Sequence, residues 1–173
     1  MWLFEKREKH TLEEMGLALL RAMMEFIATK VEHLIVEPVF YALKNDKDKL
    51  FSELLMLSFW NLQYLGYPID ILDCAVSIYL ETQELSKTEK QNLLELMDNR
   101  SKEYSDGWKK GASTLLYQVE KNIFDKIELH PCDSVMALNH IANFLSALTE
   151  ANNNNLNYII SKVKIIPSPC GKS

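Results

Sequence analysis

Two pairs of acidic residues come closest to a recognisable chemistry in this sequence. Glu81 and Glu84 form a Glu-x-x-Glu pair, and Glu95 and Asp98 form a Glu-x-x-Asp pair further along the chain. Four converging carboxylates could hold Mg²⁺ together with a phosphate chain, because this hard cation prefers oxygen donors. The first question is therefore whether the two pairs can meet.

The order of these pairs superficially resembles the metal-binding carboxylates of the all-α nucleotide pyrophosphatases. This resemblance implies a metal-dependent nucleotide phosphohydrolase as an alternative function. The expected helix boundaries, however, place Glu84 at the end of one helix and Glu95 nearly two turns into the next. An antiparallel pairing would then leave the pairs roughly 12 Å apart at 1.5 Å rise per residue. We interpret the four carboxylates as a solvated helix face, and we expect no cofactor.

The only tight cluster of histidine and cysteine is formed by His130, Cys132 and Asp133. A cysteine nucleophile beside a histidine is one hypothesis, because the start of a helix lowers the pKa of a thiol. The spacing across Pro131 does not by itself aim the imidazole at the sulfur. We therefore interpret the segment as the entry to a helix, with Asp133 as its capping residue.

The common motifs of catalysis and metal binding are absent from the sequence. There is no Gly-rich phosphate loop, no Gly-x-Ser-x-Gly, no His-Glu-x-x-His and no EF-hand loop. With only five glycines, the chain has little material for loops that bind phosphate through backbone N–H groups. A non-enzymatic function is favoured.

Charge and cysteine content narrow the possible partners and the setting. The chain has 19 basic and 24 acidic residues, a net charge of -5, and arginine occurs only three times. We therefore expect no nucleic acid partner, because such binding relies on basic surfaces and on the forked contacts of arginine. Cys74, Cys132 and Cys170 are odd in number and form no Cys-x-x-Cys, which favours a reducing, cytoplasmic setting.

No segment of the sequence predicts a membrane span. The most apolar stretch, 50–65, is shorter than the ~18 to 20 residues that cross a bilayer, and it contains Glu53. The apolar opening of the chain, residues 1–4, is too short for a secretory signal. We interpret 50–65 as a buried helix instead.

Apolar residues recur at helical spacing through most of the chain. Capping boxes at Thr11 with Glu14 and at Ser86 with Glu89 mark two helix starts. The second helix is apolar on all sides, which is typical of a central helix. A short loop is predicted at 152–155, and 156–166 is either a helix or a strand. The predicted helices cover residues 11–36, 48–65, 69–84, 86–102, 108–128 and 133–150.

These elements predict an all-α fold, a compact array of six or seven helices built around the first two. We expect a single all-helical domain over residues 1–166 and a flexible tail over 167–173. Leu62 to Ala75, followed by Tyr79, resembles the spacing of one tetratricopeptide repeat. An array of stacked helical pairs is therefore an alternative topology.

Two surfaces are candidates for binding a partner. The last long helix has a polar but uncharged face, which suits partial burial better than free surface, where Lys and Glu are usual. The N-terminus carries a small apolar hook. The candidate interface residues are Trp2, Leu3, Phe4, Asn139, His140, Asn143 and Ser146.

We therefore expect a regulatory or adaptor protein that binds a protein partner, a second copy of itself, or both. Two alternatives from other classes are kept. One is the phosphohydrolase above, and the other is a carrier of an apolar small molecule between the two central helices.

Overall fold

The computed structural model describes residues 8–125 and 127–166, and these are almost entirely helical, which confirms the predicted all-α array. Within these ranges there are six α-helices, one 3-10 helix and two short strands. The predicted hook at Trp2, Leu3 and Phe4 and the predicted tail lie outside the described residues. In chain order the elements are β1 (Glu8–Thr11), α1 (Leu12–Leu34), η1 (Pro38–Leu43), α2 (Lys47–Tyr64), α3 (Ile69–Thr82), α4 (Lys87–Lys110), α5 (Ala112–Phe124), α6 (Pro131–Lys162) and β2 (Val163–Ile166).

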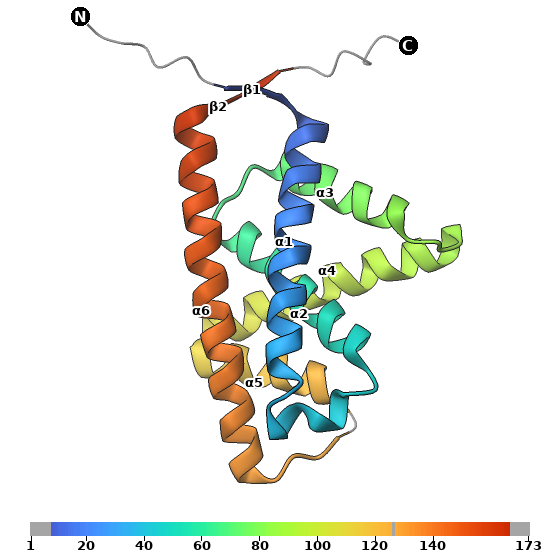
Figure 1. Cartoon of the computed structure of the whole chain (residues 1–173), viewed down its shortest axis with the longest axis vertical. Coiled ribbons are helices and arrows are strands. Elements are labelled where there is room, and N and C mark those ends of the chain that lie inside the picture. The colour runs from blue at the N-terminus through green and yellow to red at the C-terminus, as the bar shows by residue number, and fades with distance from the viewer. Residues whose placement is uncertain (1–7, 126, 167–173) are drawn as a thin grey trace, which may run out of the picture.

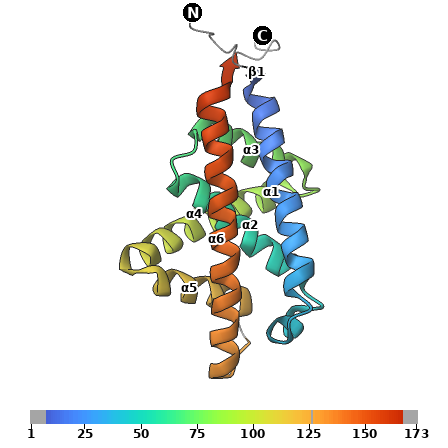
Figure 2. The same cartoon turned by 60° about the vertical axis from the view of Figure 1, so that its left-hand side comes forward.

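The two longest vertical elements of Figure 1, α1 and α6, run antiparallel along the long axis of the molecule. The start of α1 and the end of α6 are held together by two short strands. Strand β1, which precedes α1, pairs in parallel with β2, which follows α6. The helical hairpin of α3 and α4 projects to one side (Figure 1). Turned by 60°, α6 stands in front of the other helices along its whole length (Figure 2). One side of α6 therefore faces outward.

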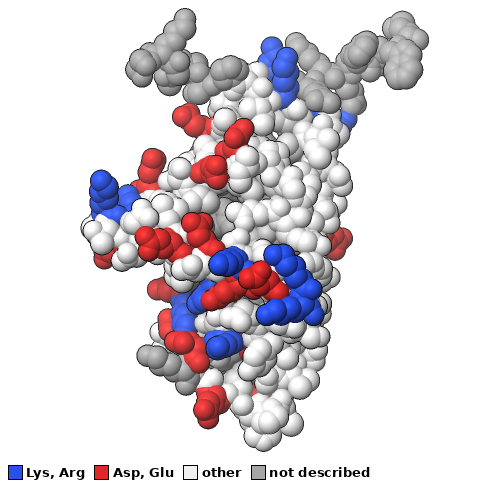
Figure 3. All heavy atoms as spheres, turned by 180° about the vertical axis from the view of Figure 1, so that it is seen from behind, with Lys and Arg blue, Asp and Glu red and all other residues white. Residues whose placement is uncertain are grey.

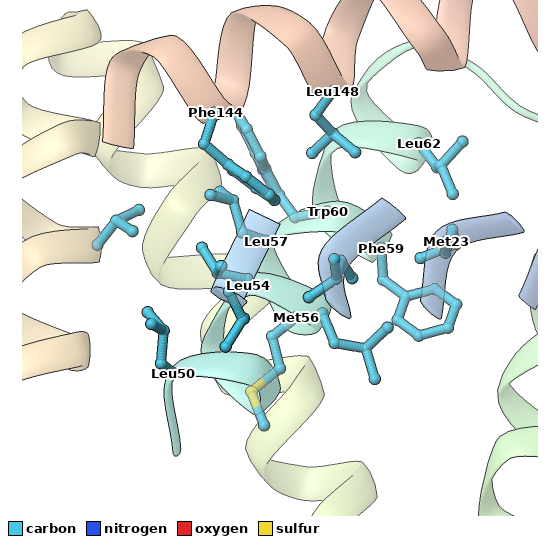
Figure 4. Close-up of a cluster of buried hydrophobic side chains, with 14 of the residues drawn as sticks. Met23, Leu50, Leu54, Met56, Leu57, Phe59, Trp60, Leu62, Phe144 and Leu148 are labelled. Atoms are coloured by element: carbon cyan, nitrogen blue, oxygen red, sulfur yellow. The ribbon is translucent and has the colours of Figure 1, made fainter. Parts of the chain in front are cut away.

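Helix α2 is the central helix, as predicted from its all-round apolar surface. Leu50, Leu54, Leu57 and Leu62 are each fully buried, and burying such a side chain contributes about 1.5–3 kcal/mol. In Figure 4, Phe144 and Leu148 point from α6 toward Leu57 and Trp60 of α2. The buried cluster draws residues from every α-helix, from η1 and from β2. The inward side of α6 is thus fixed against α2.

Both predicted capping boxes are present. At the start of α1, the Glu14 N–H donates to Thr11 Oγ1 at 3.1 Å and the Thr11 N–H donates to Glu14 Oε2 at 2.9 Å. At the start of α4, the Glu89 N–H donates to Ser86 Oγ at 3.3 Å and the Ser86 N–H donates to Glu89 Oε2 at 2.8 Å. Each box satisfies two backbone donors that a helix start leaves without partners.

The predicted break between the helices at 86–102 and 108–128 is wrong, because α4 continues through it to Lys110. Gly107 is buried inside the helix, and a Cβ atom there would lie 3.1 Å from the Cα of Leu115 on α5. This glycine therefore allows close packing of two helices and does not form a turn. The chain turns instead at Gly111, whose φ of +128° favours glycine.

The predicted loop at 152–155 is also wrong, because α6 runs unbroken for 32 residues. Asn152 is buried on the inward side of the helix, while Asn153 and Asn154 are exposed. The ambiguous segment 156–166 resolves into both alternatives, helix as far as Lys162 and strand β2 after it. Helix α6 thereby extends along nearly the full height of the molecule (Figure 1).

The segment that resembles a tetratricopeptide repeat spans α2 and α3. In the structure α3 packs mainly against α1, and it contacts α2 much less. The two helices therefore do not form the paired unit that such repeats stack. Among the described residues, none of the helices is both long enough and apolar enough to cross a bilayer.

Candidate interaction surface

An open groove of about 580 Å³ lies between α6 and the junction of α4 with α5. One wall is apolar, and the edge along α6 is polar. Ser146, one of the predicted interface residues, belongs to that polar edge. The groove is lined by Trp108, Ala112, Leu116, Ala142, Leu145, Ser146, Thr149, Glu150, Asn153 and Asn154.

Aromatic packing holds the apolar wall of the groove in place. Trp108, which is 37% exposed, lies edge-on to Tyr64 at 5.4 Å and to Trp60 at 6.4 Å between ring centroids. Trp60 is itself buried, and its indole N–H donates to Ser105 Oγ at 3.0 Å. The partly exposed indole ring of Trp108 is therefore backed by an ordered cluster, and it offers a flat apolar surface to a bound group.

The outward side of α6 contains three of the four interface residues predicted on this helix. Asn139, Asn143 and Ser146 are all exposed. His140 is half-buried against η1. Its ring lies edge-on to the ring of Phe40, with 5.9 Å between the ring centroids, and its Nε2 lies 3.8 Å from a carboxylate oxygen of Glu37. His140 therefore belongs to a contact within the chain, and the other three face solvent.

The exposed face continues beyond the predicted residues in both directions along the helix. Its positions alternate by three and four residues, and all are exposed. Glu150 is its only charged member. The view from behind, in which the outward face of α6 is turned away from the viewer, shows acidic and basic side chains gathered together low on the molecule (Figure 3). We call this set the α6 stripe: Met136, Asn139, Asn143, Ser146, Glu150, Asn153, Asn157 and Ile160.

Sequence reasoning missed Asn153, Asn157 and Ile160 because it placed a loop at 152–155. The spacing itself carried the signal, since Asn153, Asn157 and Ile160 continue the three-and-four alternation that starts at Asn139. An uncharged outer face over so many turns is unusual for an exposed helix.

The acidic pairs Glu81 with Glu84 and Glu95 with Asp98 are all exposed, on α3, just after it, and on α4. Glu95 accepts a hydrogen bond from Gln91 at 3.2 Å. In the part of the chain that the structure describes, no three or more histidine, cysteine, aspartate or glutamate side chains are placed to hold a metal ion. The phosphohydrolase alternative gains no geometric support.

The residue that caps α6 is His130, so the predicted capping role of Asp133 is wrong. Pro131 occupies the first helical position and has no N–H, and the next backbone donor, from Cys132, is 3.3 Å from His130 Nδ1. The imidazole is therefore directed at the helix backbone. Cys132 is exposed.

A polar network between α2 and α4 escaped the sequence analysis. The guanidinium of Arg100 donates to both carboxylate oxygens of buried Glu53, at 3.0 to 3.3 Å, and also to Glu103 at 3.0 Å. The Tyr104 hydroxyl donates to Glu53 at 3.1 Å. The one available signal was a glutamate in the most apolar stretch of the chain.

Burial and the neighbouring carboxylate of Glu53 shift the pKa values of Arg100 and Tyr104. Burial disfavours the charged form of Arg100, but the hydrogen bonds and charge of Glu53 outweigh it and raise the pKa of Arg100. Burial, and then the charge of Glu53, raise the pKa of Tyr104 well above its ordinary value. The carboxylate of Glu53 is fully engaged, so the network acts as a structural tie between α2 and α4.

The space between α1 and α2, where the carrier alternative places its ligand, contains a hollow of about 440 Å³. Its lining is mixed: Ala28, Val31 and Phe51 are apolar, and Thr29, Glu32, Lys47 and Asp48 are polar or charged. Lys47 and Glu32 form an ion pair across 3.2 Å there. The apolar groove beside α6 is the better candidate for a small apolar molecule.

No protein family, curated protein or solved structure was found that matches this chain. The α6 stripe and the adjoining groove are therefore the observations from which a function is inferred.

Proposed function

We propose that this protein is a non-enzymatic interaction protein that binds a protein partner through the α6 stripe and the groove beside it. The observation that supports this most is the scarcity of charge along the stripe, where Glu150 is the single charged residue over about 36 Å at 1.5 Å rise per residue. The cores of protein interfaces are depleted in charged residues. Removing an exposed amide or hydroxyl from water costs less than removing an ion, and a partner's polar groups can replace the lost hydrogen bonds.

The groove supplies the second element of a binding surface, a place for an apolar anchor. Trp108, Leu116 and Leu145 contribute apolar lining next to a polar edge. Binding energy in interfaces concentrates where an aromatic or aliphatic side chain fills such a pocket and excludes water. A partner segment lying along α6 would place its apolar side chains in the groove and its polar groups against the asparagines. This is the arrangement expected of a regulatory or adaptor protein, or of a self-associating one.

Site-specific photo-cross-linking in the cells that naturally make the protein tests this proposal. A photoreactive residue is placed at Asn143 on the stripe, and in a matched control at Ser77, an exposed position on α3. We expect covalent adducts with protein at position 143 and none at position 77. Equal adduct yields at the two positions, or none at either, would refute the proposal.

An apolar small molecule in the groove is the second candidate function. The groove volume of about 580 Å³ falls in the range of roughly 300–1,000 Å³ that is common for small-molecule sites. Bound ligand would contact Trp108 and change its fluorescence, and it would add mass to the folded chain in a native mass spectrum. Added mass that disappears in Leu116→Asp would favour the carrier over the interaction protein.

A further inference from the structure

The α6 stripe has a self-complementary order of residue types. The eight positions of the stripe can be paired from its two ends inward, the first with the last, the second with the second-last, and so on. The point midway between the two members of every pair is then the height of Leu148 on the helix. An antiparallel copy of the same helix would therefore align all of the pairs at once. The pairs are Met136 with Ile160, Asn139 with Asn157, Asn143 with Asn153, and Ser146 with Glu150.

We propose that the occupant of the α6 stripe is a second copy of this chain, bound through its own α6 in antiparallel orientation; this rests on the proposed function of the same face. In a symmetric pair, residue i of one copy meets residue j of the other, and j meets i. In an antiparallel pair of α6 helices, the residues that meet across the stripe are of compatible types. Apolar ends meet apolar ends, and amides, which both donate and accept, meet amides.

Electrostatics selects the antiparallel orientation. In a parallel pair Glu150 would face the partner's Glu150, placing two carboxylates together at an interface, which is costly. In the antiparallel pair Glu150 faces the partner's Ser146, whose hydroxyl can donate a hydrogen bond to the carboxylate. The only charged position of the stripe is thereby given a partner instead of a like charge.

The spacing and the small residues of the stripe suit close helix packing. Alternation by three and four residues is the spacing of the seam between two packed helices. Ala142, Ser146 and Ala147 have small side chains, so a second helix can approach the middle of α6 closely. Asparagine in such a seam fixes register and orientation but lowers affinity. We therefore expect a specific dimer that is weak and depends on concentration.

Analytical ultracentrifugation of the full chain is the first test. The chain has a mass of 20.0 kDa, and we expect its average mass to rise toward twice that value between about 1 μM and about 200 μM, a range that covers weak interfaces. A mass of one chain at every concentration would overturn the proposal.

Charge changes at the centre of the stripe test the orientation. Ser146→Glu should weaken the dimer at least tenfold, because each new carboxylate faces the partner's Glu150. Ser146→Lys should preserve or tighten it, and Ser146→Glu with Glu150→Lys should restore it. In a parallel pair Ser146→Lys would face itself, so weakening by Ser146→Lys would overturn the antiparallel arrangement. Circular dichroism melting checks that each variant folds.

Disulfide trapping tests the register independently of affinity. With the three natural cysteines replaced by alanine, Asn143→Cys with Asn153→Cys should form dimers on mild oxidation. The two positions lie about 15 Å apart along one helix, too far for a disulfide within a chain. Asn143→Cys alone should not cross-link, since each Cys would face the partner's Asn153. Equal trapping of the single and double variants would overturn the register.

These outcomes separate the two proposals. A purified chain that stays monomeric, combined with position-143 adducts to a different protein in cells, would overturn the dimer and leave the interaction function standing. A monomeric chain without adducts would overturn both.

Discussion

Asn152 of α6 donates a hydrogen bond from its side-chain Nδ2 to Oδ1 of Asn61 of α2, over 2.8 Å. Both side chains are buried. Asn61 Nδ2 donates in turn to Thr149 Oγ1 at 3.0 Å, and Thr149 donates to the carbonyl oxygen of Leu145 at 2.8 Å. This chain of hydrogen bonds fixes the rotation of α6 against the central helix. The α6 stripe faces outward because Asn152 faces inward.

Asn152→Ala should lower the free energy of unfolding by about 1–3 kcal/mol, because it leaves the buried Oδ1 of Asn61 without its donor. Asn154→Ala is the matched control two residues along the same helix. Its side chain is exposed, so the change should stay within about 0.5 kcal/mol. Urea denaturation measures both values. Similar losses of stability in the two variants would contradict a special role for the buried hydrogen bond between Asn152 and Asn61.

The asparagine run also illustrates what local sequence could not decide. Four consecutive polar residues are typical of a loop, yet the cost of each asparagine in a helix is below about 0.7 kcal/mol. Burial of Leu148 and Ile159 on either side keeps the helix continuous. The deciding contact of Asn152 lies with Asn61, which is 91 positions away.

The Glu53–Arg100 pair should show strong coupling in a double-mutant cycle. Arg100→Leu leaves the buried carboxylate with only the Tyr104 hydroxyl, at a cost of about 3 kcal/mol or more. Glu53→Met leaves the guanidinium without its main acceptor. The double variant removes both charges, so it should be more stable than the sum of the single losses predicts, by about 1–3 kcal/mol. Additive losses in urea denaturation would show that the two groups stabilise the fold independently.

Alkaline pH should destabilise the protein through Tyr104. Burial, and then the charge of Glu53, raise the pKa of Tyr104 above the ordinary value of 10.0. The unfolded chain therefore loses this proton first, and the free energy of unfolding falls as pH rises above about 10, by up to about 1.4 kcal/mol per pH unit for one proton. Below that pH the contribution of this group is constant.

Tyr104→Phe tests this assignment. The variant should be less stable at neutral pH, because Glu53 loses a hydrogen-bond donor, but its stability should fall less steeply between about pH 10 and about pH 11. Burial also raises the pKa of Tyr67 to about 12, and this contribution is unchanged in the variant. Tyr117→Phe, at a 60% exposed position, controls for loss of a surface hydroxyl. An unchanged slope in Tyr104→Phe would contradict the assignment.

Gly16→Ala should destabilise the contact between α1 and α3. An added Cβ would lie 2.9 Å from Cys74 Sγ and 3.1 Å from the backbone nitrogen of Ala75. Overpacking of this kind costs about 1–3 kcal/mol, more than the gain of about 1 kcal/mol from better helix propensity. In a Cys74→Ala background the loss should be smaller, because the sulfur is gone. A rise in the thermal midpoint for Gly16→Ala would contradict this close packing.

Features set by neighbouring residues could be predicted from the sequence. The apolar stripes, both capping boxes and the central role of 50–65 depend on contacts within a few residues or on hydrophobicity alone. Gly107 could not be placed, because its role is set by Leu115 on the next helix. The strands β1 and β2 pair across almost the whole chain, and neither is stable without the other. Three of the eight positions of the α6 stripe were predicted. The groove could not be predicted, because it depends on the packing of α4, α5 and α6.

The rate at which a cysteine at position 143 reacts with a thiol reagent tests most directly whether the α6 stripe is covered by protein. Asn143→Cys and the control Ser77→Cys are each placed in a chain whose natural cysteines are alanine. We expect position 143 to react several-fold more slowly in the cells that naturally make the protein than in dilute purified protein, with position 77 unchanged. Equal protection of the two positions, or no protection of position 143, would contradict the account.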